Sequence, residues 1–395
     1  MGVRIDISEY LKRNNMTQKD LAVRLNITDA NLSNLLSGKS YKGLWDNLEK
    51  MAALFNCSIG DMIVQTPTKK IIPMFLDYSG TTDNLLKGGV EKLKKFLDAI
   101  NALERKLTLE DPNHDEYEIR AYIITGTSTK KALPKVVPFH QMAKRYGMPT
   151  LFNSAVTEYC GFDVQFNDNI PVDEEIKTDP DDKESFNRYF TLNVLVKNLQ
   201  VIEDSREEIN EILRDYTDGE GTEAYIASDV KSMFNVQFGK ISEEAQKEAV
   251  SRISLLLQNK LGKKLNGVID VVPYYDEYGI ECDFKPSANT KPNSVKLIMS
   301  RLREEYDVPF IIIGGDNKKE DIAMYTGNKE ELTAAGIRSI FIAPSNIGEL
   351  TPEYENDPNI IVSNFEKVSG VIDGIEKVAI GVRYNRREGE FEWEI

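Results

Sequence analysis

Carboxylate and hydroxyl side chains follow three apolar runs of this sequence, each where the run ends. These are Asp77 after residues 71–76, Thr125 after residues 120–124, and Asp316 and Asp321 after residues 310–313. Runs of this length and composition predict buried strands, and ligands bind at the carboxyl ends of such strands in open α/β sheets. An aspartate placed there is suited to bind Mg²⁺ or to attack phosphorus as a nucleophile. For each acid taken alone, an ordinary strand-to-helix loop is the alternative interpretation.

Two further residues complete the pattern. Lys291 begins an amphipathic stretch just before the third apolar run, and Ser79 stands two residues after Asp77. The order strand–Asp, strand–Thr, Lys, strand–Gly–Asp–x4–Asp resembles the haloacid dehalogenase superfamily of phosphotransferases. The resemblance covers residues 70–150 and 285–395. It implies a doubly wound, mostly parallel, Rossmann-like α/β core with an α+β cap inserted into it.

The resemblance also implies a role for each of these residues. The residues that match the catalytic positions of the family are Asp77, Ser79, Thr125 and Lys291. Those that match its Mg²⁺ ligands are Asp77, the backbone carbonyl of Ser79, Asp316 and Asp321. Glu320 competes with Asp321, because the family accepts three or four residues between the two acids. Thr125 is expected to donate its hydroxyl to phosphoryl oxygens, and Lys291 is expected to neutralise their charge.

Ser79 is a departure from the family pattern. Most phosphatases of this type have a second aspartate at that position, which protonates the leaving group. General acid catalysis is worth about 10²–10⁴ in rate, and a serine hydroxyl is too weak an acid to supply it. The sequence therefore leaves three outcomes open for this domain: active phosphotransfer, sensing of a phosphorylated small molecule, and a catalytically dead scaffold.

The first 65 residues have a different character, because residues 5–65 predict five short helices, the first at residues 5–15 and the last at residues 58–64. Thr17 and Thr28 are predicted N-caps, and Asn26 is predicted to adopt the left-handed conformation in the turn between two helices. The run 16–39 resembles the lambda-repressor-like (Cro-like) helix-turn-helix, whose second helix enters the major groove of DNA. The alternative is a module for dimerisation or protein docking.

The helix-turn-helix resemblance implies a set of residues that contact DNA. It consists of Gln18, Asp29, Ala30, Asn31, Asn34, Lys39 and Lys42. Asn31 or Asn34 could pair with adenine, whereas Gln18 and the two lysines would contact phosphates. Asp29 is unusual at a groove, where its charge disfavours phosphate, although it could accept a hydrogen bond from cytosine.

Charge is unevenly distributed along the 395 residues, whose formal net charge is −15. Eight of the 49 basic and seven of the 64 acidic residues lie in residues 1–65, so this segment has a balance of +1 and the remainder −16. An acidic body repels nucleic acid. Any contact with double-stranded DNA is therefore expected within residues 1–65.

We expect three domains: an all-α helix-turn-helix domain at residues 1–65, an α/β core at residues 70–150 and 285–395, and a cap at residues 151–284. Within the core, a helix is expected at residues 138–147. The segment 153–155 resembles the point where one branch of the haloacid dehalogenase superfamily leaves its core for the cap. The first residues lack the apolar segment of a signal peptide, and three scattered cysteines offer no disulfide framework. A cytoplasmic location is therefore expected.

The leading hypothesis is a DNA-binding regulator, expected to be a homo-oligomer, whose second domain binds, and at most slowly hydrolyses, a phosphorylated small molecule with Mg²⁺. An active phosphatase with an accessory helix-turn-helix and a switch protein that acts through protein contacts are the alternatives.

Overall fold

A computed structural model describes residues 2–5, 7–36, 43–66, 70–87, 89–112, 115–196, 199–216, 224–227, 230–239, 241–276, 279–385 and 390–393. The chain divides into two compact units. The first is formed by residues 1–70 with 301–307, and the second by residues 71–300 and 308–395. Within the described residues, no helix is both long and apolar enough to cross a membrane.

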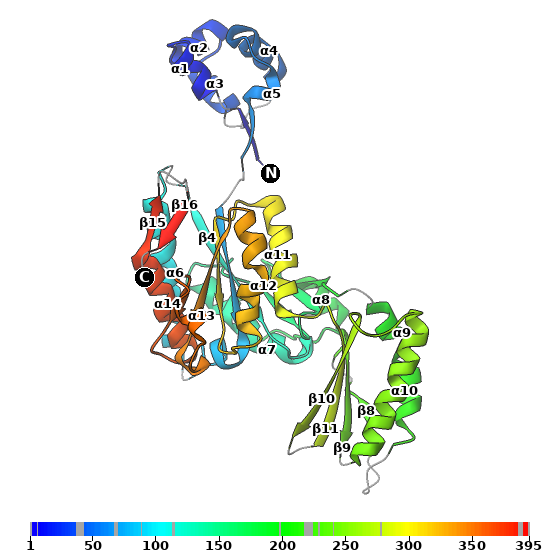
Figure 1. Cartoon of the computed structure of the whole chain (residues 1–395). Helices are drawn as coiled ribbons and strands as arrows, with labels where there is room; N and C mark the ends of the chain where they lie inside the picture. Colours follow the sequence, from blue (N-terminus) through cyan, green and yellow to red (C-terminus); the bar gives the residue numbers. More distant parts are fainter. Residues whose placement is uncertain are drawn as a thin grey trace. The chain divides into compact units, whose positions relative to one another are not determined.

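The first unit is a small helical domain closed by a two-stranded sheet (Figure 1). Its elements are β1 (Gly2–Ile5), α1 (Ser8–Arg13), α2 (Gln18–Leu25), α3 (Asp29–Leu36), α4 (Leu44–Phe55), α5 (Ile59–Met62) and β2 (Ile63–Thr66). The side chain of Thr17 accepts a hydrogen bond from the backbone N–H of Asp20, whose carboxylate accepts from the N–H of Thr17, so the two form a capping box. Thr28 accepts from the N–H of Asn31 at 3.1 Å, and Asn26 has a φ of 57°. The predicted caps and turn are therefore confirmed.

The ends of this domain differ from the prediction. Residues 5–15 and 58–64 were expected to be helical throughout, but residues 2–5 pair with residues 63–66 as antiparallel strands. The five predicted helices are present, although the domain is not all-α. The local apolar spacing could not reveal this sheet, because the two strands lie about sixty residues apart in the sequence.

The second unit is built on a mostly parallel sheet with the strand order β14-β13-β12-β3-β4-β5-β6-β7. The strands are β3 (Lys70–Asp77), β4 (Tyr117–Ile124), β5 (Phe152–Thr157), β6 (Phe162–Phe166), β7 (Phe190–Val194), β12 (Phe310–Gly314), β13 (Arg338–Ala343) and β14 (Ile360–Val362). The central strands β3 and β12 are buried along nearly their whole length, as expected for strands covered on both faces.

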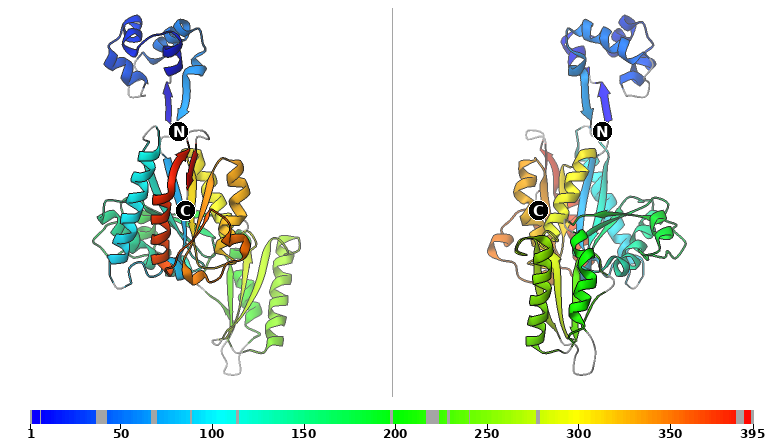
Figure 2. Two further views of the ribbon diagram at one scale, coloured as in Figure 1. Left: turned by 60° about the vertical axis from the view of Figure 1, so that its left-hand side comes forward. Right: turned by 90° about the vertical axis from the view of Figure 1, so that its right-hand side faces the viewer.

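Helices cover both faces of this sheet. They are α6 (Glu91–Glu110), α7 (Thr129–Arg145), α8 (Lys183–Tyr189), α11 (Lys291–Glu305), α12 (Asp321–Ala334), α13 (Pro352–Glu355) and α14 (Lys367–Gly381). Figures 1 and 2 show α6 and α14 side by side on one face and α11 and α12 on the other. A hairpin of β15 (Val382–Asn385) and β16 (Glu390–Trp393) follows α14.

An α+β insert lies between β7 and α11. Its sheet has the order β10-β11-β9-β8, and α9 (Leu199–Leu213) and α10 (Glu243–Leu261) lie side by side against one face of it (Figure 1). The strands are β8 (Tyr225–Ile226), β9 (Phe234–Gly239), β10 (Ile269–Asp276) and β11 (Gly279–Pro286). Along β9, buried and half-buried residues alternate, which leaves one face of the sheet to the helices and the other to polar side chains.

Two features of the second unit correct the sequence analysis. The insert was placed at residues 151–284, with its departure point at 153–155, but residues 152–157 form β5, which pairs with β4. β6 and β7 then continue the central sheet by antiparallel pairing. The helix expected at residues 138–147 begins instead at Thr129 and passes through two prolines. Its buried apolar face supplies the packing that maintains the helix despite the missing N–H groups.

Candidate functional site

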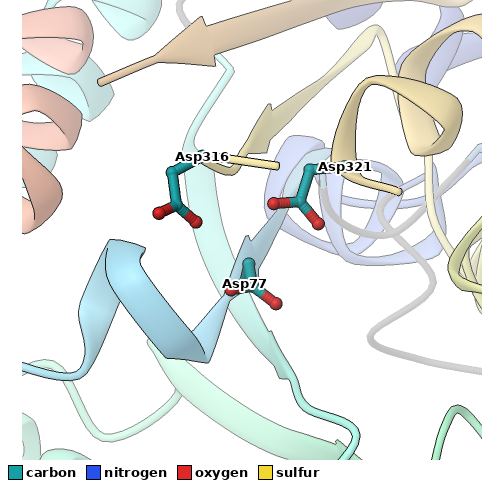
Figure 3. A group of neighbouring side chains, drawn as sticks. All are labelled: Asp77, Asp316 and Asp321. Carbon is teal, nitrogen blue, oxygen red and sulfur yellow. The ribbon is translucent and has the colours of Figure 1, made fainter. Parts of the chain in front are cut away.

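Three aspartates meet at the carboxyl edge of the central sheet. Leu76 pairs with Gly314 in parallel register, so the chain leaves the adjacent strands β3 and β12 side by side. Asp77 ends β3, Asp316 lies in the loop after β12, and Asp321 begins α12. One carboxylate oxygen from each of the three lies within 4.8 Å of the others (Figure 3). Strand pairing thus joins acids that are about 240 residues apart in the sequence.

Lys291 lies among these carboxylates. Its ammonium donates to Asp77 Oδ1 at 2.7 Å and to Asp321 Oδ1 at 2.6 Å. Glu320 is farther away, at 3.6 Å, and its side chain is mostly exposed, whereas Asp321 is fully buried. Of the two competing acids, Asp321 therefore belongs to the cluster. We call Asp77, Asp316, Asp321 and Lys291 the acid cluster.

The carboxylate of Asp316 is held by groups from two other loops. Thr81 donates to its Oδ1 at 3.3 Å, and Asn346 donates to its Oδ2 at 2.6 Å. Gly80 has a φ of +73°, and a Cβ at that position would lie 2.0 Å from Asp316 Oδ2. A side chain at residue 80 would therefore displace the carboxylate. Asn346 was not foreseen, although it follows β13 and the rule of polar residues at strand ends could have found it.

The acid cluster lies at one side of a cavity of about 700 Å³. The lining residues include Asp77, Ser79, Gly80, Thr125, Gly126, Tyr159, Lys285, Lys291 and Asp316. Ser79 is exposed to the cavity, whereas Thr125 is buried and directs its hydroxyl to Thr127 Oγ1 at 3.1 Å. The structure thus brings together all six residues predicted for this site, since Asp321 joins them through Lys291.

Electrostatics at the acid cluster reflect an excess of negative charge. Burial, followed by the neighbouring carboxylate of Asp321, raises the pKa of Asp77 to about 7, although Lys291 acts in the opposite direction. Burial and Asp321 also raise the pKa of Asp316. Burial alone would lower the pKa of Lys291, but Asp321 and Asp77 raise it above its usual value. The directions agree with three carboxylates that share a single ammonium.

This donor set fits a hard divalent cation. Three ionised carboxylates and one ammonium leave a formal charge of −2, which a divalent ion would balance. The converging atoms are all oxygens, the ligands that Mg²⁺ prefers over those of softer metals. The residues present are therefore compatible with the magnesium site that the sequence predicted.

The predicted DNA-binding residues gather at the start of α3 in the first unit. Asp29, Ala30 and Asn31 are exposed there, and Gln18 is half-buried at the start of α2. Asn34 lies in the same helix, but its side chain is outside the described part of the chain, as are Lys39 and Lys42. An exposed stretch on the second helix of the motif has the placement that groove recognition requires.

Comparison with known proteins identifies the first unit. Residues 6–67 match the Cro/C1-type HTH DNA-binding domain. No curated protein matches the sequence of the chain. The chain therefore carries a helix-turn-helix of this type at its start, as predicted, followed by a domain of a separate α/β class.

Among solved structures, the chain is similar to trehalose-6-phosphate phosphatase of Aspergillus fumigatus, with 12% identity over 79% of this chain and 93% of that one and a TM-score of 0.43. A haloacid dehalogenase-like hydrolase protein of Bacillus subtilis has 13% identity over 79% and 95%, with a TM-score of 0.35. IMP-nucleotidase of Plasmodium falciparum has 12% identity over 65% and 61%, with a TM-score of 0.35. These similarities are distant, and the interpretation of the site depends on its own geometry.

Proposed function

We propose that this protein is a DNA-binding regulator whose second domain binds a phosphorylated small molecule with Mg²⁺ and hydrolyses it slowly at most. The observation that supports the ligand site is the convergence of Asp77, Asp316 and Asp321 around Lys291 beside one cavity. The motif order of the haloacid dehalogenase superfamily agrees with this geometry. Three carboxylates that share one ammonium leave unbalanced buried charge, which favours an ion-binding site over a dead scaffold.

In the proposed mode, Asp77, Asp316, Asp321 and the backbone carbonyl of Ser79 hold Mg²⁺. The ion would neutralise phosphoryl oxygens and so favour their approach to a carboxylate. Lys291 contributes a fixed positive charge next to Asp77, and Thr125 offers a hydroxyl at the same cavity. Asp77 is placed to act as the nucleophile.

Slow turnover follows from the residue at position 79. Ser79 faces the cavity but cannot protonate a leaving group at neutral pH. Among the carboxyl groups that line the cavity, Glu320 is the one outside the acid cluster, but it is exposed and lies beside Lys291. Binding without efficient release of the leaving group is suited to a sensor, because the ligand then persists long enough to report its concentration.

Regulation is inferred from the combination of the two domains. The helix-turn-helix would read DNA with Asn31 and its neighbours on α3, and such proteins usually bind two half-sites as dimers. The net negative charge of the second domain disfavours contact with DNA there. We therefore infer that the phosphorylated ligand modulates DNA binding.

The ligand half of the proposal is tested by calorimetric titration of the full-length protein with inorganic phosphate. We expect heat of binding with Mg²⁺ present and none after chelation with EDTA. Thermal unfolding offers a second measurement, since a ligand that binds only the folded state raises the midpoint temperature. Absence of both effects would refute a magnesium-phosphate site.

The DNA half is tested by selection of binding sites from random duplex DNA with the full-length protein. Asn31→Ala is then expected to weaken binding to the selected site by about tenfold or more, because a bidentate contact to adenine contributes ~1–3 kcal/mol. Asn14→Ala is the control, since Asn14 is exposed at the end of α1, outside the motif. Failure to enrich any sequence, even at low salt, would refute the regulator.

A further inference from the structure

The insert turns a polar sheet face toward the core. On β9, Phe234, Val236 and Phe238 are buried against α9 and α10, so Asn235 and Gln237 point to the opposite face. Glu281 pairs with Gln237 across the strands and shares that face. Tyr225 pairs with Gln237 from the other side. We call Tyr225, Asn235, Gln237 and Glu281 the polar wall.

The polar wall lines a second cavity of about 750 Å³. The opposite side of this cavity comes from the core, with Thr127 and Ser128 in the loop after β4 and Lys130 and Lys131 in the first turn of α7. Thr125 and Gly126, in the same loop, line the first cavity. A single short loop thus borders both spaces.

Tyr159 lines both cavities and so marks their junction. Its ring lies beneath the ammonium of Lys285, 5.5 Å from the ring centroid. A Cβ at Gly126 would lie 3.1 Å from ring atom Cε1, so the loop backbone packs closely against the ring. With a lysine and a loop against it, this ring leaves little room for a stacked aromatic base.

The wall is joined to the core by a buried carboxylate. Glu158 accepts hydrogen bonds from the backbone N–H groups of Lys231 and Ser232 in the insert, at 2.7 and 2.8 Å. Its other oxygen accepts from the hydroxyl of Thr129, at the start of α7, at 3.0 Å. Glu158, which directly precedes Tyr159 in the chain, therefore holds the insert against the core.

The chemistry of the wall selects a kind of ligand. The N–H groups of both amides are used within the sheet, since Gln237 donates to its neighbours and Asn235 donates to Asp283. The groups left for a ligand are therefore acceptors, namely the amide oxygens and the carboxylate of Glu281. The three side chains already bond to one another, with Gln237 donating to both Asn235 and Glu281, which fixes their orientation. An ordered array of amide and carboxylate acceptors fits vicinal hydroxyl groups, each of which can donate a hydrogen bond. It would leave its own polar groups unsatisfied against an apolar ligand.

We propose that the ligand is a phosphate monoester of a polyhydroxylated body, a sugar or polyol phosphate, with its phosphate at the acid cluster and its hydroxyl groups against the polar wall. This inference rests on the proposed phosphate site. A nucleotide is less suited to this site, because Lys285 and the loop at Gly126 already occupy the surroundings of the Tyr159 ring, where a base would stack.

The test compares three phosphates with the full-length protein in Mg²⁺, by calorimetric affinity and by phosphate release. They are glucose 6-phosphate, cyclohexyl phosphate, which is similar in size but lacks the hydroxyl groups, and acetyl phosphate, which is too small to reach the wall. We expect glucose 6-phosphate to bind at least about tenfold tighter than cyclohexyl phosphate, from two or more added hydrogen bonds.

Gln237→Met is expected to abolish that preference while the affinity for acetyl phosphate stays unchanged. Tyr225→Phe removes one hydroxyl from the wall and should reduce the preference for glucose 6-phosphate by a smaller factor. This milder variant keeps the test informative if Gln237→Met does not fold. Gln200→Met makes the same chemical change on the outer helix α9, where Gln200 is exposed and bonds to Asp204, and should leave the preference intact.

The outcomes separate the two proposals. Equal affinity for glucose 6-phosphate and cyclohexyl phosphate overturns the sugar or polyol assignment and leaves the phosphate site standing. A preference for adenosine monophosphate over both, measured as a fourth ligand, has the same consequence. No Mg²⁺-dependent binding of any phosphate, acetyl phosphate included, overturns the phosphate site and this inference together.

Discussion

The acid cluster and the polar wall face neighbouring cavities but are built in opposite ways. The acid cluster joins three carboxylates and one ammonium, and Asp77, Asp321 and Lys291 are all largely buried. The polar wall holds mainly neutral side chains, which are half-buried or exposed on a sheet with only one apolar face. Buried charges are expensive and need a fixed counterpart, whereas amides adapt to a range of partners.

This difference indicates a division of tasks. Groups in the acid cluster would contact the phosphate that all ligands share, so a change there should affect all ligands alike. Groups in the polar wall would contact only the variable body, so a change there should affect some ligands and spare acetyl phosphate. Four predictions test this division, beginning with the largest expected effect.

Asp77→Asn should abolish any phosphate release, by ~10⁴–10⁶-fold relative to the unmodified protein, as removal of a covalent nucleophile does elsewhere. The loss should be equal for glucose 6-phosphate and acetyl phosphate. Asp83→Asn is the matched control, because Asp83 is an exposed acid that pairs with Lys367 outside the cavity. Unchanged release in Asp77→Asn would show that another group attacks phosphorus.

Ser79→Asp should raise phosphate release by ~10²–10⁴-fold, because it supplies the missing general acid. Ser79 is exposed to the cavity and has an ordinary extended backbone, so the larger side chain can be accommodated. Ser79→Ala should leave the slow rate as it is. Steady-state release of inorganic phosphate is the measurement. No increase with Ser79→Asp would indicate that protonation of the leaving group does not limit turnover.

Two lysines that line the same cavity should behave differently. Lys291→Met should lower phosphate release by ~10²–10³-fold for every ligand, because it removes the positive charge beside Asp77, where the phosphoryl group would bind. Lys285 lies on β11 of the insert, so Lys285→Met should change the affinity for glucose 6-phosphate and leave the affinity for acetyl phosphate unchanged. The same two assays measure both variants.

Lys291→Arg keeps the charge and shows how much of the first effect arises from lost folding stability. If Lys291→Met and Lys285→Met lowered the release of phosphate from acetyl phosphate equally, the proposed division between the two regions would be wrong.

Gly80→Ala should weaken Mg²⁺ binding by ~10–100-fold, the usual effect of disturbing groups that orient a metal ligand. The added Cβ would lie 2.0 Å from Asp316 Oδ2 and displace that carboxylate. Gly336→Ala is the control, because Gly336 has the same φ of +73° with no atom within 4 Å of its Cβ position. Calorimetric titration with Mg²⁺ measures the effect. An equal loss in both variants would assign it to backbone strain alone.

The sequence by itself determined the helix-turn-helix. Its caps and turn depend on contacts between residues three or four apart, such as Thr17 with Asp20 and Thr28 with Asn31, and such contacts can be recognised within a short stretch of sequence. The sequence also located Asp77, Thr125 and Asp316, because each follows an apolar run long enough to form a buried strand.

Only the tertiary structure decided how distant segments combine. Strand order and register decide which acid pairs with Lys291 and where the insert begins. They also bring Asn346 close enough to donate a hydrogen bond to Asp316. The polar wall depends on them too, because alternation along β9 defines two faces but cannot say which one meets the core. These contacts join residues that are tens to hundreds of positions apart, so they cannot be predicted from the local spacing of residues in the sequence.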